Sequence, residues 1–357
     1  MAIRLGLITA AHVHTPGYVA GLARAAAGPG ALPAAVWAGI WDHDAGRGEA
    51  FAAAHGLPIF GQRDALIAAC DAVVITSENR RHAEHLMAAM AAGRHVLCEK
   101  PVVTTAEEAA RVRAAAAAMP ASAVLMTAFP CRYAPGYAEL VRVLESGRIG
   151  RVRAIAATNR GTCPHGWFTD AAESGGGALM DHVVHVADVV RHLPLRAPTS
   201  DDSGADAREA NRGHRPNVAT RIRAQVGTGM YGGFGRATPV EDVAMLTIDL
   251  ADGPFVTLDA SWSRPAAYRT WGDVMITVVG DAGVIEVDLF GQEVQRYGAA
   301  NGRSHAALGF GADLDAAMMR EFLTAIGEGR PARTTLEDGI AAAEWAMEAG
   351  RAARVSS

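Results

Sequence analysis

One lysine stands out among the residues that could do chemistry. The chain of 357 residues has 33 basic side chains, and all of them are arginine except Lys100. Lys100 lies in Glu99-Lys100-Pro101, directly after a short apolar run. Because Pro101 restricts the preceding residue to extended backbone, the Lys100 amine should leave the end of that run in a defined direction. It could bind a substrate hydroxyl and share in proton transfer, or it could be a solvated lysine at a turn.

A second polar group follows a run of glycines at 175–177. Asp181 and His185 are four residues apart, so on a helix they share one face. A carboxylate beside an imidazole orients the ring and raises its basicity, as a general base requires. Asp188 falls roughly on the same side. The alternative is a polar pair with a purely structural role. The glycines favour function, because they let another segment or a ligand approach closely.

The elements that must position these residues alternate between strand and helix in the first third of the chain. Strands are predicted at 3–9, 34–41, 57–60, 72–76, 95–98 and 123–127, and helices at 17–27, 45–55, 64–69, 81–92 and 106–118. This order predicts a doubly wound parallel sheet of the Rossmann type, an α/β architecture that binds ligands outside the carboxyl ends of its strands.

The pattern then changes. Helices are predicted at 135–146, 178–193, 312–326 and 336–353, strands at 151–158, 220–226, 244–250, 255–262, 273–279 and 284–289, and a polar loop at 196–217. Consecutive strands without helices between them indicate an antiparallel meander, so this part is expected to be α+β with an open, mainly antiparallel sheet. We expect a dinucleotide-binding domain at 1–129, a substrate and oligomerisation domain at 130–335, and a C-terminal helix at 336–357 that returns towards the domain boundary.

Together these motifs resemble the glucose–fructose oxidoreductase / inositol dehydrogenase / MocA family. The resemblance rests on Glu99-Lys100-Pro101 and on Gly-Gly-x-Leu-x-Asp-x-x-x-His-x-x-Asp at 176–188. The segment 71–82 looks like the family's fourth-strand signature, with Glu78 where proline is usual, and 313–340 is similar to its closing helices. It implies an NAD(P)-dependent oxidoreductase that transfers hydride at a hydroxyl carbon of a sugar, polyol or cyclitol.

The resemblance also implies roles for single residues. Lys100, Asp181 and His185 would surround the carbon that loses hydride. The cofactor would be bound by Thr9, Ala11, His12, Asp42, Ser77, Asn79, His82, Glu99 and Lys100. The substrate would meet His14, Arg132, His165, Trp167, Asp181 and His182. Asp42 ends the second predicted strand, where an acidic group binds ribose hydroxyls and repels a 2′-phosphate, so NAD is expected rather than NADP.

The first loop departs from the family pattern. Where Gly-x-Gly-x-x-Gly usually follows the first strand, this chain has Thr9-Ala10-Ala11-His12-Val13-His14. Those glycines normally allow a tight turn, close approach of the pyrophosphate and helix packing. Thr9 and Ala11 are small enough for a modified loop, in which the Thr9 hydroxyl could meet a phosphate.

His12 and His14 suggest an alternative, because His-x-His after a first strand also opens metal-dependent hydrolases. His165, His182 and His185 could complete such a site, but the two-domain order does not fit that fold, and we expect no metal. Two further alternatives are glycoside cleavage with a retained NAD and a non-catalytic NAD-binding regulator.

Composition excludes other classes. The net charge of -5 and the lack of a long basic run argue against nucleic acid as a partner. No apolar run reaches the length of a membrane span, and no leader pattern precedes the first strand. The four cysteines are spread singly, so we expect a reduced, cytoplasmic protein. An open sheet suits face-to-face packing, so a homodimer or homotetramer is expected.

Overall fold

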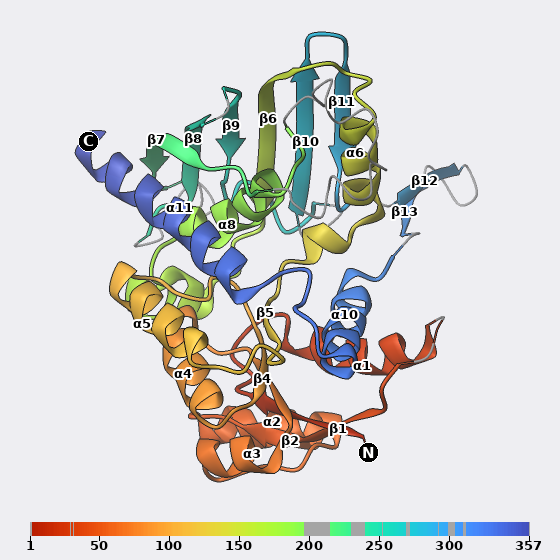
Figure 1. Cartoon of the computed structure of the whole chain (residues 1–357), viewed down its shortest axis with the longest axis vertical. Coiled ribbons are helices and arrows are strands. Elements are labelled where there is room, and N and C mark those ends of the chain that lie inside the picture. The colour runs from red at the N-terminus through yellow and green to blue at the C-terminus, as the bar shows by residue number, and fades with distance from the viewer. Residues whose placement is uncertain are drawn as a thin grey trace. The chain divides into compact units, whose positions relative to one another are not determined.

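The computed structural model divides into two compact units, each assembled from separate stretches of the chain (Figure 1). The first unit comprises Met1–Pro130, Pro164–Val184 and Leu314–Met347, and the second comprises Cys131–Cys163, His185–Asp313 and Glu348–Ser357. The structure describes residues 2–28, 30, 32–195, 215–229, 240–251, 253–268, 272–291, 293–298, 304–309 and 312–356. Most of the polar loop expected at 196–217 therefore lies outside the described residues.

The first unit is built on a five-stranded parallel sheet. Its strands are β1 (Ile3–Ile8), β2 (Ala35–Trp41), β3 (Ala72–Ile75), β4 (His95–Cys98) and β5 (Leu125–Thr127). Their order is β2-β1-β3-β4-β5, and every neighbouring pair is parallel. All four residues of β3 are buried, as expected for a central strand covered on both faces. The predicted Rossmann-type fold is confirmed, and the strand order reverses direction between β1 and β3, where such sheets bind ligands.

Helices with clear sequence signals surround this sheet. They are α1 (Thr15–Ala27), α2 (Ala45–His55), α3 (Arg63–Ala69), α4 (His82–Ala91), α5 (Ala106–Ala117), α7 (Ala171–Ser174) and α10 (Leu314–Glu328), with 3-10 turns η1 (Asn79–Arg81) and η3 (Gly166–Thr169). Thr105 caps α5 in a reciprocal capping box with Glu108. Gly56 ends α2 in the left-handed conformation. The strand predicted at 57–60 is wrong: only Ile59 pairs, in a single bridge to Ile40.

The second unit is built on a six-stranded sheet in the order β11-β10-β6-β9-β8-β7. Its strands are β6 (Val152–Gly161), β7 (Ala219–Gly227), β8 (Val243–Leu250), β9 (Phe255–Asp259), β10 (Gly272–Gly280) and β11 (Val284–Asp288). The expected meander is corrected in one place, because β6 and β9 pair in parallel. β6 comes much earlier in the chain and enters the sheet between β9 and β10, a pairing that local patterns do not reveal.

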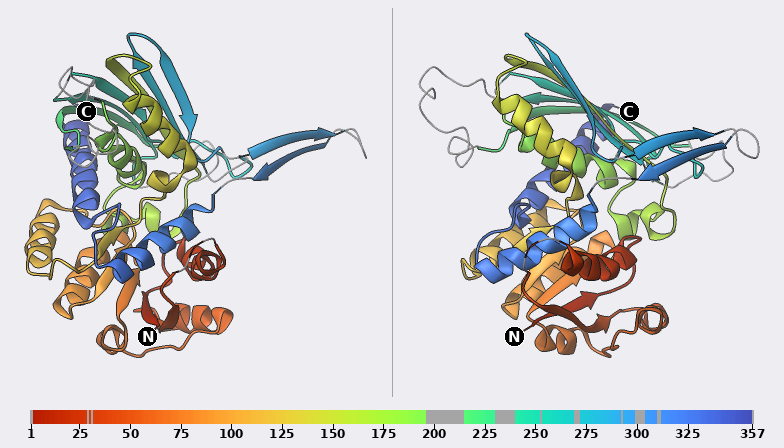
Figure 2. Two further views of the ribbon diagram at one scale, coloured as in Figure 1. Left: turned by 45° about the vertical axis from the view of Figure 1, so that its right-hand side comes forward. Right: turned by 90° about the vertical axis from the view of Figure 1, so that its right-hand side faces the viewer.

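A β-hairpin of β12 (Glu293–Gly298) and β13 (Ser304–Gly309) was not predicted. Figure 2 shows it extending away from the six-stranded sheet. The remaining turn and helix near the sheet are η2 (Pro130–Tyr133) and α6 (Pro135–Glu145), and α6 packs beside β11. Two helices contribute to both units: α8 (Ala178–Arg191) and α11 (Leu336–Ser356).

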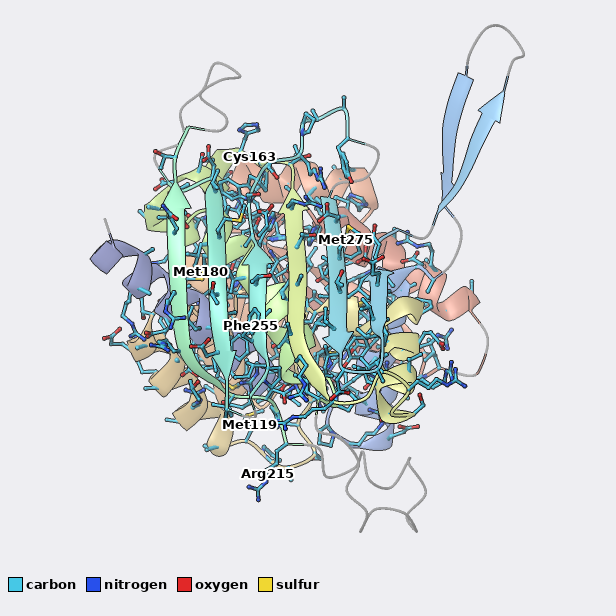
Figure 3. The ribbon with its side chains drawn as sticks, turned by 90° about the horizontal axis from the view of Figure 1, so that it is seen from above. Met119, Cys163, Met180, Arg215, Phe255 and Met275 are labelled. Atoms are coloured by element: carbon cyan, nitrogen blue, oxygen red, sulfur yellow. The ribbon has the colours of Figure 1, made fainter. Side chains whose placement is uncertain are left out.

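One face of the six-stranded sheet carries exposed apolar side chains among polar ones. Register places Met275, Thr158, Asp259 and Met245 in one row across β10, β6, β9 and β8. Met275 is 40% exposed and Met245 is 50% exposed, and Phe255 on β9 is 45% exposed. Figure 3 looks onto the sheet, and no described helix of the second unit crosses this face. Among the described residues, no helix is both long and apolar enough to span a membrane.

Two glycines of α11 provide a matched stability test. A Cβ at Gly339 would overlap the Thr127 hydroxyl, which is held by its bond to the Thr335 carbonyl at 2.9 Å. A Cβ at Gly350 would meet nothing within 4 Å. We expect Gly339→Ala to lower the free energy of unfolding by about 1–3 kcal/mol through overpacking. Gly350→Ala should raise it by up to about 1 kcal/mol, because alanine favours helix. Denaturant titrations of both variants check this, and equal effects would contradict the packing.

Candidate active site

The turn after β1 keeps the backbone shape of a glycine turn without glycine. Thr9 has a φ of 66°, in the left-handed region that a β-branched residue rarely adopts. Its fully buried hydroxyl donates to the Thr76 carbonyl at 2.9 Å, which ties β1 to the end of β3. This bond holds the turn. Contact between the hydroxyl and a phosphate stays a prediction, and the hydroxyl proton is already engaged.

Glu99, at the end of β4, gathers the polar side chains of this loop. It is 2% exposed and accepts hydrogen bonds from Tyr18 Oη at 2.7 Å and His14 Nδ1 at 3.0 Å. Burial raises the pKa of Glu99, but the neighbouring histidines and Lys100 outweigh it and hold the pKa well below its usual range. Burial lowers the pKa of His14, yet the charge and hydrogen bond of Glu99 prevail and the pKa is raised.

His12 lies next to His14 and Glu99, and its ring is neutral. Burial lowers its pKa to about 3. Its Nδ1 accepts the backbone N–H of His14 at 3.2 Å, so the proton of the neutral ring is on Nε2. That Nε2 is buried and has no hydrogen-bond partner among the described residues. The rings of His14 and Phe168 pack edge-on with the His12 ring, and their centroids lie 4.6 and 5.3 Å from the His12 centroid.

His12, His14 and Glu99 are close enough to hold a metal ion, since their ligand atoms lie within 4.8 Å of one another. Two of the ring nitrogens already have bonds, since Nδ1 of His12 accepts an N–H and Nδ1 of His14 is bonded to Glu99. A metal bound through either of these nitrogens would have to replace such a bond. The geometry therefore favours a hydrogen-bonded cluster.

Lys100 and Asp181 form a buried ion pair. Lys100 is 2% exposed and Asp181 3%. The Lys100 amine donates to the Asp181 carboxylate and also to its carbonyl at 3.2 Å. The second carboxylate oxygen of Asp181 lies 3.2 Å from His182 Nε2. Burial raises the pKa of Asp181, but the charges of Lys100 and His182 and their hydrogen bonds hold it well below its usual range. The structure thus brings the predicted lysine and aspartate into contact.

The glycine run brings the start of α8 against the loop that follows Lys100. A Cβ on Gly175, whose φ is 77°, would lie 2.7 Å from Thr104. Nδ2 of Asn79 donates to the Ser174 carbonyl at 2.9 Å. The close approach expected of these glycines is therefore made by the chain's own Thr104. This packing sets where Asp181 meets Lys100.

His82 and Ser77 serve the same junction. The ring nitrogens of His82 lie 2.7 Å from the Pro101 carbonyl and 3.0 Å from the Ser77 carbonyl. The Ser77 hydroxyl donates to the Glu78 carbonyl at 3.2 Å. Both side chains are fully buried. Their direct contact with a cofactor stays a prediction, and the bonds present join the ends of β3 and β4.

Asp42 follows β2, and both of its carboxylate oxygens accept hydrogen bonds. It accepts from the backbone N–H groups of Ala10 at 2.8 Å and Asp44 at 2.9 Å. Arg47 on α2 bonds both of its oxygens. Burial raises the pKa of Asp42, but the hydrogen bonds from Arg47, Ala10 and Asp44 lower it overall.

The other predicted substrate residues have varied surroundings. Trp167 stacks on Phe168 at 3.8 Å and donates its indole N–H to the Ala11 carbonyl at 3.0 Å. His165 is exposed, with a φ of 57°. In the second unit, Arg132 Nη1 contacts Asp188 Oδ1 at 3.2 Å, and both are buried. His185 is buried on α8, one turn after Asp181. Substrate contact by these residues stays a prediction.

The carboxyl edge of the parallel sheet fits a polar ligand. His12 Nε2, beyond β1, and Asn79 Oδ1, beyond β3, are buried without a hydrogen-bond partner among the described residues. Leaving such atoms unpaired costs free energy, so a ligand that bonds them would bind there with advantage. These two strands flank the reversal of strand order, where a dinucleotide crosses sheets of this type.

Comparison with known proteins agrees with this arrangement. Residues 16–127 match an oxidoreductase family domain described as an NAD-binding Rossmann fold. Residues 137–286 match the GFO/IDH/MocA C-terminal domain. The two matches together cover more than half of the chain. The chain belongs to the Gfo/Idh/MocA oxidoreductase family. The first match begins immediately after the loop from Thr9 to His14 that lacks the glycines.

Individual Gfo/Idh/MocA relatives match parts of the chain. A 1,5-anhydro-D-fructose reductase of Ensifer adhaerens is 37% identical over 34% of this chain and 37% of its own length. Inositol 2-dehydrogenase 2 of Saccharopolyspora erythraea is 34% identical over 54% of this chain and 52% of its own length. The chain thus spans about half or less of these two relatives. A levoglucosan dehydrogenase solved with NADH and levoglucosan shares the fold, with a TM-score of 0.79, 21% identity and coverage of 100% of this chain and 98% of that one.

Sequence reasoning missed three participants. Tyr18 is one helical turn after His14, and that spacing could have indicated its contact with Glu99. Arg47 is five residues after Asp42, but nothing in the local pattern indicates that it would turn back to it. The contact of Thr104 with Gly175 joins segments that are far apart in the chain, and no local pattern indicates it.

The His14–Glu99 pair predicts a pH dependence of stability. Because the pKa of His14 is raised on folding, its stabilising charge interaction is present below the ordinary pKa of 6.5 and is lost as the pH rises through the raised value. The difference in melting temperature between wild type and His14→Gln should therefore be larger at acidic than at alkaline pH. Thermal denaturation across the pH range measures it, with the exposed His55→Gln as control. A difference independent of pH would contradict the pairing.

Proposed function

We propose that this protein is an NAD-dependent dehydrogenase acting on a CH–OH carbon of a sugar, polyol or cyclitol. The observation that carries the proposal is the buried Lys100–Asp181 pair beside the carboxyl edge of a Rossmann-type sheet. Family membership and the relatives' names, which include an inositol dehydrogenase, support it. The two carboxylates at this corner of the sheet, Asp42 after β2 and Glu78 after β3, would disfavour a 2′-phosphate there, which supports NAD over NADP.

In this proposal a bound nicotinamide supplies the hydride acceptor. Candidates to hold the cofactor are His12 Nε2 and Asn79 Oδ1, which have no hydrogen-bond partner among the described residues, and the corner after β2 where Arg47 bonds Asp42. The Lys100 amine is fixed by Asp181 and has a third proton with which to bind the substrate hydroxyl. His185, on the α8 face shared with Asp181, takes the hydroxyl proton as general base. Lys100 stabilises the oxygen as negative charge develops on it.

Two substitutions test these roles. Lys100→Ala and His185→Ala should each lower kcat by about a hundredfold or more, as expected for loss of acid–base groups. NAD affinity should change far less, because neither side chain is expected to carry most of the cofactor binding. Steady-state kinetics and calorimetric titration with NAD measure the two effects. Lys100→Arg and His185→Gln serve as conservative companions, and near-normal turnover in either alanine variant would contradict that residue's role.

The reaction class is tested with a polyol and sugar panel. A dehydrogenase should bind NAD and accumulate NADH with at least one substrate. Release of sugar from glycosides without net NADH would indicate cleavage with a recycled cofactor. Loss of all turnover after chelation, restored by metal, would favour a metal enzyme built on His12 and His14. NAD binding with no turnover would favour a regulator.

Exposed apolar side chains on one face of the six-stranded sheet support a homodimer or homotetramer. Exposed apolar side chains gathered on one face commonly mark protein contacts. Met245 on β8 and Met275 on β10 lie in the same cross-strand row of that face, and strands β9 and β6 lie between them. The four cysteines are buried and none forms a disulfide in the described part of the chain, which supports a reducing, cytoplasmic setting.

Charge on this face tests the assembly. Met245→Glu/Met275→Glu should shift the protein to a smaller species, because association would bury two like charges on each chain. Light scattering of purified protein measures the mass. Val36→Glu replaces an equally exposed apolar residue on β2 and should leave the mass unchanged. A monomeric wild type would contradict the proposed assembly.

A further inference from the structure

An arginine held between two carboxylates lies beside the end of β2. Arg47 Nε and Nη2 bond the two oxygens of Asp42, at 2.8 and 2.7 Å. Its remaining terminal nitrogen, Nη1, bonds Glu78 Oε1 at 3.1 Å. Asp42 follows β2 and Glu78 follows β3, so Arg47 links the edges of two strands. We refer to these three residues as the Arg47 clamp.

Both carboxylate oxygens of Asp42 are fully occupied by hydrogen bonds. Each carboxylate oxygen already accepts one backbone N–H, from Asp44 or from Ala10, in addition to one bond from Arg47. A carboxylate has about four lone-pair sites, so all of them are taken. The Asp42 side chain is fully buried, whereas that of Arg47 is 29% exposed. The group that this corner offers to a ligand from solvent is therefore the Arg47 guanidinium.

Glu78 decides whether that guanidinium is available. Its side chain is 6% exposed, and besides Arg47 it lies 3.5 Å from Arg81 Nε and 3.5 Å from His43 Nε2. Guanidinium groups bind phosphate strongly through paired N–H donors, and Arg47 and Arg81 are two such groups in one place. The carboxylates of Asp42 and Glu78 offset the charge of Arg47, whereas Arg81 is shared between Glu78 and Glu173, whose Oε1 lies 3.5 Å from Arg81 Nη2. Removing the charge of Glu78 therefore makes the surroundings of Arg47 less negative.

We infer that Glu78 is the specificity-determining residue of this corner, and that it excludes nucleotides with a 2′-phosphate by occupying Arg47. The inference rests on the proposed NAD-dependent function and deepens it. With Glu78 neutral, Arg47 keeps its bonds to Asp42, and its Nη1 no longer faces a negative charge that would repel a phosphate placed beside it. Asp42 alone does not then reject NADP, because its charge is matched by Arg47.

Calorimetric titration with NAD and with NADP tests this without measuring activity. Wild type should prefer NAD. In Glu78→Gln the ratio of the NADP to the NAD dissociation constant should fall by about tenfold or more, as expected for a new charge-assisted contact. Glu78→Ala removes the same charge and is measured beside it, so that poor folding of one variant does not decide the result. In the double variant Glu78→Gln/Arg47→Gln the ratio should return towards the wild-type value, because the guanidinium that would bind the phosphate is gone.

Glu84→Gln is the matched control, because Glu84 is an exposed glutamate on α4 that pairs with Arg63. In Glu84→Gln the ratio of the NADP to the NAD dissociation constant should equal the wild-type ratio. The inference is overturned if both Glu78 variants keep the wild-type ratio, or if the double variant keeps the NADP gain. Failure of wild type to bind either nucleotide would overturn the proposed function itself, and the inference with it.

Discussion

The buried ion pair of Lys100 and Asp181 is the interaction on which the arrangement of the first unit depends. Each partner is almost completely removed from water, so each would be costly alone. Its partners are far apart in the chain, one beyond β4 and one in α8. The glycine run, the Asn79 bond to Ser174 and the packing of Thr104 on Gly175 all hold these two segments together. Much of the local structure is thus explained by the need to place one amine beside one carboxylate.

A second constraint is the absence of glycine from the turn after β1. The turn keeps its shape because Thr9 accepts the left-handed conformation and its hydroxyl is bonded to β3. The side chains that replace the glycines are not simply tolerated. His14 pairs with Glu99, and within the described part of the chain the Nε2–H of His12 has no partner, at the edge where a ligand would cross. The departure from the family's usual loop therefore places polar side chains at this edge of the sheet where glycines are usual.

Charge is balanced separately at the two ends of this edge. Near β4 the carboxylates of Glu99 and Asp181 face Lys100 and His14. Near β2 the carboxylates of Asp42 and Glu78 face Arg47 and Arg81. Each carboxylate in these groups is largely buried, and burying a charge without a partner would be costly. The ion pairs offset that cost and fix the side chains in place, as orienting a polar ligand requires.

The sequence by itself determined the Rossmann-type fold, the family and the candidate residues at the strand ends. Alternating strand and helix signals are local, and residues such as Lys100 and Asp42 are placed at the sheet edge by strand direction alone. It also placed Asp181 and His185 on one helix face, since that follows from helical spacing. It did not reveal that Asp181 meets Lys100, because that contact joins distant segments.

Only the tertiary structure decided the pairings that depend on such distant contacts. The parallel pairing of β6 with β9, the Arg47 bonds to Asp42 and the Tyr18 bond to Glu99 have no unique local pattern. The compact units likewise draw on separated stretches of the chain, and the packing of α10 on α1 is a contact between distant segments. The physical reason is that a side chain's partner is chosen by the packing of the whole core, whereas propensity and spacing act over only a few residues.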